Sequence, residues 1–145
     1  MLYGIDPLVG PDLLHALRSM GHGDEVAIVD ANFPAASFAQ RLIHLESADA
    51  IRVVDAILRL MPLDRDVTFA ASVMQVIDQP ETSLPIYDEF KRTIAAHQEG
   101  IQMATLERSA FYERARACFA VIATGELRAY GNLILSKGVI ETEGV

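Results

Sequence analysis

The chain has 145 residues, with 12 basic and 20 acidic side chains that give a formal net charge of −8. This length is enough for one domain with a full hydrophobic core, but not for two independent domains. The acidic balance and the absence of a Lys or Arg cluster exclude typical nucleic-acid binding and binding to an anionic membrane, because both need concentrated positive charge.

Hydropathy gives a second set of limits. The longest apolar run, residues 117–123, is far shorter than the ~20 residues that cross a bilayer, and the N-terminus lacks the form of a signal peptide. We therefore expect a cytoplasmic protein without membrane contact. The mean hydropathy of +0.23 is high for a monomer of this size, which predicts subunit contacts. The lone Cys118 has apolar neighbours, which favour a buried filler over a nucleophile.

The first third of the sequence predicts a helix, a tight turn and a buried strand in close succession. Pro11 suits the first turn of a helix whose apolar positions keep helical spacing as far as Met20. Gly21 suits the end of that helix, and a strand at 26–30 follows a very short turn. Residues 35–39 are small and read as a loop.

The rest of the chain alternates between helical and strand patterns. In chain order the expected elements are a strand at 42–45, a helix from Asp49 to Met61, a strand at 67–76, a helix at 84–98, a strand at 101–106, a helix at 109–117, and strands at 118–123 and 133–135. Such alternation predicts a layered α/β domain with a largely parallel sheet, spanning residues 1–145.

Two polar residues stand at the two ends of the strand at 26–30. His22 follows a helix C-terminus, which carries partial negative charge, and Asp24 and Glu25 come soon after it. These influences favour imidazolium, which suits a proton donor; the alternative is a solvated histidine beside a helix cap. Asp30 lies where the strand stops being apolar, and ligands of open α/β sheets sit outside the carboxyl ends of strands.

Motifs of common cofactors are missing from the sequence. A dinucleotide cofactor is not expected, since the chain has neither Gly-x-Gly-x-x-Gly nor a phosphate loop. No metal is expected either, because His22 and Asp30 would be two ligands without a third. What remains suits a neutral ligand rich in hydroxyl groups. The side chains that offer donors and acceptors to such a ligand are Asp30, Arg108, Tyr130 and Asn132.

Seven segments, in order over nearly the whole chain, resemble the L-fucose mutarotase and D-ribose pyranase family. They are Pro11–Leu14, Met20–Glu25, Asp30–Pro34, Phe111–Ala115, Thr124–Glu126, Tyr130–Asn132 and Lys137–Val139. The ribose-type members carry a histidine where this chain has Arg108, and they lack the run at 111–115. The resemblance therefore favours the fucose branch.

This resemblance implies a structure and a set of site residues. The implied fold is a single three-layer α/β/α domain that assembles into a ring-shaped, typically decameric homo-oligomer, with sites where neighbouring subunits meet. The implied proton donor is His22, and the implied sugar-binding residues are Asp30, Arg108, Tyr130, Gly131 and Asn132. We expect His22 and Asp30 to share one small cavity, within one chain or between chains.

The implied activity is the interconversion of the α and β anomers of a free aldose, with L-fucose as the expected sugar. Acid–base ring opening and reclosure needs no cofactor. The base that partners His22 stays open among Asp30, Tyr130 and a water molecule. Two alternatives remain at this point: a D-ribose pyranase, and a non-catalytic sugar-binding accessory to sugar uptake.

Overall fold

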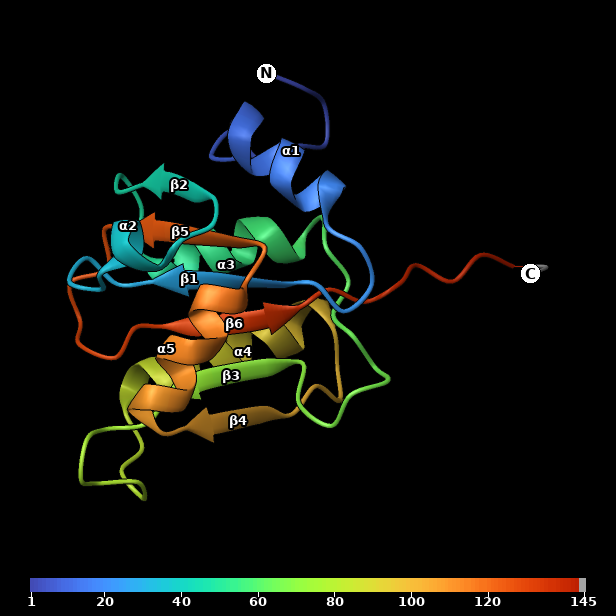
Figure 1. Ribbon diagram of the computed structural model, residues 1–145. Helices are drawn as coiled ribbons and strands as arrows, with labels where there is room; N and C mark the ends of the chain where they lie inside the picture. The colour runs from blue at the N-terminus through green and yellow to red at the C-terminus, as the bar shows by residue number, and fades with distance from the viewer. Residues whose placement is uncertain (144–145) are drawn as a thin grey trace.

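A six-stranded sheet forms the middle of the molecule, with its strands in the order β2-β5-β1-β6-β3-β4 (Figure 1). The computed structural model describes residues 1–143, so residues 144–145 of the predicted domain lie outside the described part. The strands are β1 (Glu25–Val29), β2 (Leu42–Leu45), β3 (Ala71–Met74), β4 (Met103–Leu106), β5 (Ala120–Thr124) and β6 (Leu133–Ser136). The helices are α1 (Pro11–Ser19), α2 (Ala35–Phe38), α3 (Ala50–Leu58), α4 (Pro85–His97) and α5 (Arg108–Ala117).

Five strands run in one direction and β6 runs against them. The pairs β1–β5, β2–β5 and β3–β4 are parallel, whereas β6 is antiparallel to both β1 and β3. The prediction of a largely parallel sheet is confirmed, with one correction at its centre. The connection at 125–132 is too short for the crossover that a parallel strand would need, so the chain returns in the opposite direction.

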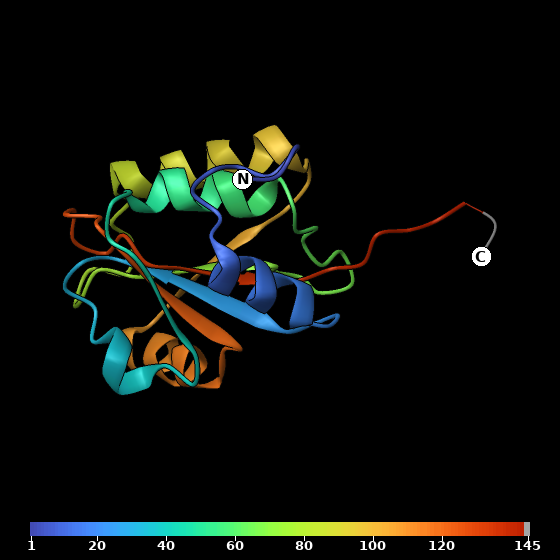
Figure 2. The ribbon, with the colours of Figure 1, turned by 90° about the horizontal axis from the view of Figure 1, so that it is seen from above.

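The sheet is covered on both faces, which makes three layers (Figure 2). Helices α3 and α4 lie on one face, and their core, joined by α1, includes Leu13, Ile57 and Phe90. Helices α2 and α5 lie on the other face, over a second core that includes Phe111 and Val121. Successive residues of a strand point to opposite faces, so each central strand supplies both cores. Among residues 1–143, no helix is long and apolar enough to span a bilayer.

Most predicted elements are present, and two predictions are wrong. The expected loop at 35–39 contains the one-turn helix α2; Phe38 stacks on Tyr112 at 5.0 Å between ring centroids, which holds this turn in place. Only residues 71–74 of the expected strand at 67–76 form a strand, β3, because the chain bends at residues 65–68. Cys118 is buried as predicted, and burial raises the pKa of its thiol to about 12.

Candidate functional site

A pocket opens at the edge of the sheet where β1 and β3 end and β6 begins. Asp30 follows β1 and Asn132 precedes β6, and the antiparallel register brings the two side chains together. The Asp30 backbone N–H donates to Asn132 Oδ1 (2.8 Å), and Asn132 Nδ2 donates to Asp30 Oδ2 (3.1 Å). Asp30 Oδ1 accepts from the Asn32 N–H (2.9 Å). Both side chains are buried, so the pair offers preorganised acceptors and donors at a fixed place.

The pocket has a volume of about 300 Å³ and walls of two kinds. Its polar residues are Asp30, Asn32, Arg108, Tyr130 and Asn132, and its apolar residues are Phe33, Met74, Ile77, Tyr112 and Ala129. The strand order β1-β6-β3 puts Met74, at the end of β3, one strand beyond the Asp30–Asn132 pair. A ligand in this pocket therefore meets hydrogen-bonding groups beside β1 and an apolar side chain beside β3.

Tyr130 enters the pocket from a strained backbone position. Its φ is +62°, one of two positive values among the non-glycine residues described, and such strain clusters at functional sites. Its hydroxyl oxygen accepts from the Ile77 backbone N–H at 3.3 Å. Gly131 instead packs behind the pocket wall, where an added Cβ would lie 2.7 Å from Glu126 Cγ and 3.0 Å from Ile86 Cδ1. Gly131 is therefore required for close packing.

The loop that carries Tyr130 is anchored by the buried carboxylate of Glu126. Burial alone would raise the pKa of Glu126, but hydrogen bonds from Arg128 and from the Ala50 backbone hold it below its usual value. Arg128 Nε donates to Glu126 Oε1 at 2.9 Å, and the Glu126 backbone oxygen accepts from the Ala31 N–H at 2.9 Å. This network joins the Tyr130 loop to the segment that follows Asp30.

Phe33, which precedes α2, and Tyr112 of α5 form an aromatic wall of the pocket, and Phe38 of α2 packs against Tyr112. Tyr112 lies 5.3 Å from Phe33 and 5.0 Å from Phe38, measured between ring centroids. The guanidinium carbon of Arg108 lies 5.1 Å from the centroid of the Tyr112 ring. Arg108 is exposed and opens α5, so it holds its donors at the mouth of the pocket.

His22 lies at the opposite end of the sheet. It sits in the glycine-bracketed turn before β1, with its side chain 44% exposed, and its Nε2 lies 3.1 Å from Oδ1 of the buried Asp64. The backbone N–H of Asp66 also donates to Asp64 Oδ1, at 2.9 Å. These hydrogen bonds, from Asp66 and then from His22, hold the pKa of Asp64 below its usual value. The result is a histidine–aspartate dyad whose carboxylate stays charged.

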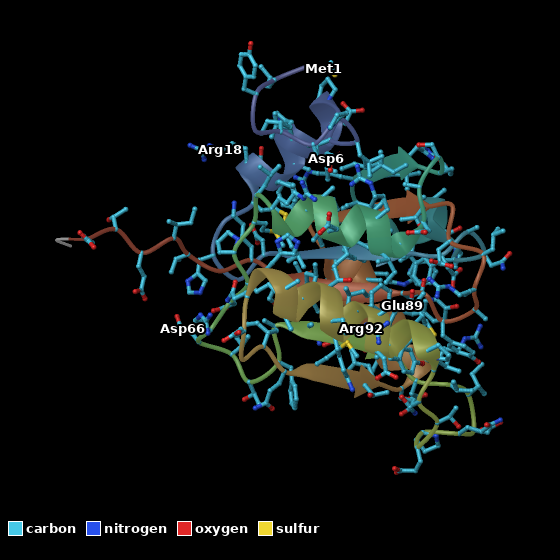
Figure 3. The ribbon with its side chains drawn as sticks, turned by 180° about the vertical axis from the view of Figure 1, so that it is seen from behind. Met1, Asp6, Arg18, Asp66, Glu89 and Arg92 are labelled. Carbon is cyan, nitrogen blue, oxygen red and sulfur yellow. The ribbon has the colours of Figure 1, made fainter. Side chains whose placement is uncertain are left out.

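A single chain does not bring His22 and Asp30 into one cavity. His22 precedes β1 and Asp30 follows it, and a five-residue strand spans about 16 Å. Figure 3 shows the molecule from behind, with Asp66, which neighbours His22, on the side from which the C-terminal segment extends. The expected shared cavity is therefore not formed within one chain. Tyr130 and Asn132, by contrast, line the same pocket as Asp30 of their own chain.

The sequence analysis missed Asp64. It lies in the irregular segment between α3 and β3, and it contacts His22 across 42 positions of sequence. No local periodicity reports such a contact. The available signal was the tripeptide Asp64–Asp66 itself, which places two acidic residues just before the apolar segment that leads into β3.

Comparisons with known proteins identify the family of this chain. A model of the RbsD / FucU transport protein family matches residues 3–140. The human fucose mutarotase is 40% identical over an alignment of 145 positions, which covers 96% of this chain and 94% of that protein. The chain belongs to the RbsD/FucU family. The resemblance that the motifs indicated is confirmed.

Two solved structures are similar to this chain in fold. The fucose mutarotase from Streptococcus pneumoniae, solved in complex with L-fucose, matches with a TM-score of 0.88 and 39% identity, covering 97% of this chain and 100% of that one. RbsD from Bacillus subtilis, complexed with D-ribose, matches with a TM-score of 0.73 and 20% identity, covering 92% and 95%. The second match shows a shared fold alone.

One group of side chains in this family member has the spacing of metal ligands. Single ligand atoms of His22, Asp64 and Asp66 all lie within 4.8 Å of one another. However, Asp66 is 78% exposed, and Asp64 Oδ1 already accepts two hydrogen bonds. The arrangement matches a proton-transfer dyad, in which a carboxylate orients an imidazole.

Proposed function

We propose that this protein is a mutarotase, an isomerase that interconverts the α and β anomers of free L-fucose without a cofactor. The observation that carries the proposal is the rigid Asp30–Asn132 pair, in a pocket of about 300 Å³, within a chain 39% identical to a mutarotase solved with L-fucose. A buried carboxylate and amide with spare lone pairs and donors suit sugar hydroxyl groups. The pocket volume lies within the range of small-molecule sites.

The chemistry requires one acid and one base. A pyranose opens when the ring oxygen gains a proton and the anomeric hydroxyl loses one, and the freed carbonyl is attacked again on its other face. The C1–O5 bond breaks and reforms, so no redox step occurs. Positioned proton transfer contributes roughly 10²–10⁴-fold, which is enough for a reaction that is already fairly fast in water.

His22 is the proposed acid, and the dyad supports that role. With Nε2 directed at Asp64 Oδ1, Nδ1 is the nitrogen left to exchange a proton with the sugar. The Asp64 carboxylate stabilises the imidazolium that donates. The base remains open among Asp30, Tyr130 and water, and all three are compatible with the pocket. A Tyr130→Phe variant that kept full activity would remove Tyr130 from this set.

The proposal requires two copies of the chain for each site. His22 of one subunit would close the pocket that holds Asp30 of its neighbour. In support, large apolar side chains are exposed at both ends of the sheet: Val67, Phe69, Val139 and Ile140 lie near the His22 end, and Ile77 and Leu127 near the Asp30 end. Contacts between unlike ends generate rings when they close, which agrees with the decameric ring that the family resemblance implies.

The walls of the pocket favour fucose over ribose as the substrate. A fucopyranose carries a methyl group on C5, where a ribopyranose carries hydrogen. Met74, Phe33 and Ile77 give the pocket an apolar side, and one methyl in such an environment changes specificity by about 10- to 200-fold. D-arabinose, which differs from L-fucose by the loss of that methyl, is the matched probe.

Saturation-transfer NMR of anomer exchange tests the proposal. We expect the protein to accelerate exchange of L-fucose above the spontaneous rate, more strongly than exchange of D-arabinose or D-ribose. A preference for ribose would support the pyranase alternative. Equal rates with and without protein would overturn the proposed enzyme.

One observation favours a second candidate function. The matching family model is described as a transport protein family, which fits a sugar-binding accessory to uptake. Fucose binding by calorimetry, without acceleration of anomer exchange, would support this alternative. A cytoplasmic location belongs to the mutarotase proposal, and cell fractionation would check it.

A further inference from the structure

The two halves of the dyad are joined by one short segment at the end of β6. On one side of this segment, the Gly23 N–H donates to the Lys137 carbonyl (2.8 Å) and the Lys137 N–H donates to the Asp24 carbonyl (2.9 Å). On its other side, the Asp64 N–H donates to the Ser136 carbonyl (3.0 Å). The turn that carries His22 and the segment that carries Asp64 are therefore hydrogen-bonded to opposite sides of residues 136–137.

The side chain of Lys137 adds a second attachment on the His22 side. Its Nζ donates to the carbonyl oxygens of Leu17 (2.7 Å) and Met20 (2.5 Å), at the C-terminal end of α1. A cation is favourable there, because the last carbonyls of a helix lack partners and carry partial negative charge. Lys137 is half-buried, so these bonds are partly shielded from water.

The turn that carries His22 needs such attachments. Glycine stands on both sides of the histidine, Gly23 has a φ of +84°, and the side chain is 44% exposed. Within the turn, Asp24 Oδ2 accepts from the Gly21 N–H at 2.7 Å. Lys137 holds the residues on both sides of this loop: Met20 through its ammonium group, and Gly23 and Asp24 through its backbone.

We propose that Lys137 is a positioning residue that holds His22 against Asp64. The inference rests on the proposed function, because it assigns Lys137 a role only through His22. The ammonium group fixes the end of α1, the fixed end of α1 sets the start of the turn, and the turn sets the 3.1 Å separation of the dyad. Loss of the ammonium group frees the turn at its first residue.

The test compares the two lysines of the sequence, Lys91 and Lys137. Lys137→Met removes the donors of Lys137, and Lys91→Met is the matched control, with the same change of charge at an exposed position of α4. Small misplacements of catalytic groups cost up to about 100-fold, so we expect K137M to lower kcat for fucose about 10- to 100-fold. KM should change less than about twofold, because the Asp30–Asn132 pair that would bind the sugar is held by contacts within its own chain that do not include Lys137. K91M should match the unaltered protein, and Lys137→Arg should keep most of the activity.

A double-variant cycle separates positioning from general stabilisation. If Lys137 acts through the dyad, K137M should lower kcat much less in a protein that already carries Asp64→Asn, because both changes disrupt the same pair of residues. If Lys137 only stabilised the fold, K137M would lower the midpoint of thermal unfolding and would lower kcat by the same factor in both backgrounds. If K137M does not assemble, Lys137→Gln carries the same cycle.

The outcomes distinguish this inference from the proposed function. An unchanged kcat in K137M, or an equal loss in both backgrounds, overturns the role of Lys137 and leaves the mutarotase intact. No acceleration of fucose exchange by the unaltered protein overturns the mutarotase itself.

Discussion

The two ends of the sheet are built in different ways. At the carboxyl end, Asp30 and Asn132 are buried and hydrogen-bonded to each other, so the proposed sugar-binding groups are fixed at the ends of the strands. At the amino end, His22 is half exposed on a glycine turn and depends on Asp64 and Lys137 for its place. The contrast teaches that the proposed binding half of a site is rigid by itself, whereas the proposed proton-donating half depends on separate supporting contacts. Strand β6 serves both, because Asn132 precedes it and Lys137 follows it.

The largest expected effect comes from the proton donor. His22→Gln should remove most of the catalytic excess over spontaneous anomer exchange, a loss of roughly 10²–10⁴-fold, while fucose affinity changes little. His15→Gln, at an exposed position of α1, is the matched control and should retain full activity. If the H22Q protein catalysed anomer exchange of fucose at the normal rate, the proposed role of His22 as proton donor would be contradicted.

The second effect comes from the carboxylate of the dyad. Asp64→Asn should lower kcat by about 10- to 100-fold, a part of the factor that general acid catalysis supplies. Hydrogen bonds from the Asp66 N–H and from His22 hold the pKa of Asp64 below 3.8. A carboxylate whose pKa is lower in the folded than in the unfolded protein stabilises the fold at pH values above its unfolded pKa. That stabilisation is lost as pH falls through the folded pKa. The stability gap between D64N and the unaltered protein, measured by denaturant melts, should therefore narrow below pH 3.8; a gap that widens on acidification would contradict the charged dyad.

A smaller effect is expected at the mouth of the pocket. Arg108→His makes the position resemble the ribose-type members, and it removes the guanidinium group 5.1 Å from the Tyr112 ring centroid. We expect the ratio of fucose to ribose exchange rates to fall by about 10-fold, as measured by saturation-transfer NMR on both sugars. Arg92→His, an exposed position on α4, should leave the ratio unchanged.

The smallest effect on activity is expected for a residue that lies away from both ends of the sheet. A hydrogen bond from Arg52, followed by one from the Leu8 N–H, lowers the pKa of Asp6 from 3.8 to about 2. Because the folded pKa is lowered, the ion pair stabilises the fold above pH 3.8 and its contribution is lost as pH falls through about 2. The difference in Tm between Asp6→Asn and the unaltered protein should be constant near neutral pH and should shrink steadily as pH falls from 3.8 through about 2. Fucose exchange at neutral pH should not change.

Local patterns predicted most of the fold. Proline at the first turn and helical spacing identified α1, and the expected helix that begins at Asp49 is α3, whose N-cap is Asp49 with its carboxylate accepting from the Arg52 N–H. Helix α2 was missed because one turn is too short to show periodicity. The direction of β6 was also beyond these patterns, since an apolar strand reads the same in a parallel or an antiparallel pair.

The carboxyl end of the site was more predictable than the amino end. Asp30 could be proposed from its place after a buried strand, a position that open α/β sheets use for ligands. The role of Asp64 could not, because its contact with His22 depends on how the chain folds across 42 residues. Lys137 was noticed only within a family segment. Its attachment to α1 is a tertiary contact over 117 to 120 positions.

The sharing of each site between two subunits is tested most directly by mixing two inactive variants. Oligomers assembled from H22Q chains and Asp30→Asn chains in equal amounts contain some interfaces at which an intact His22 meets an intact Asp30 of the neighbour. We predict that these mixtures regain about a quarter of the unaltered activity for random head-to-tail assembly. Mixed oligomers that form but accelerate fucose exchange no more than either variant alone would contradict the shared site.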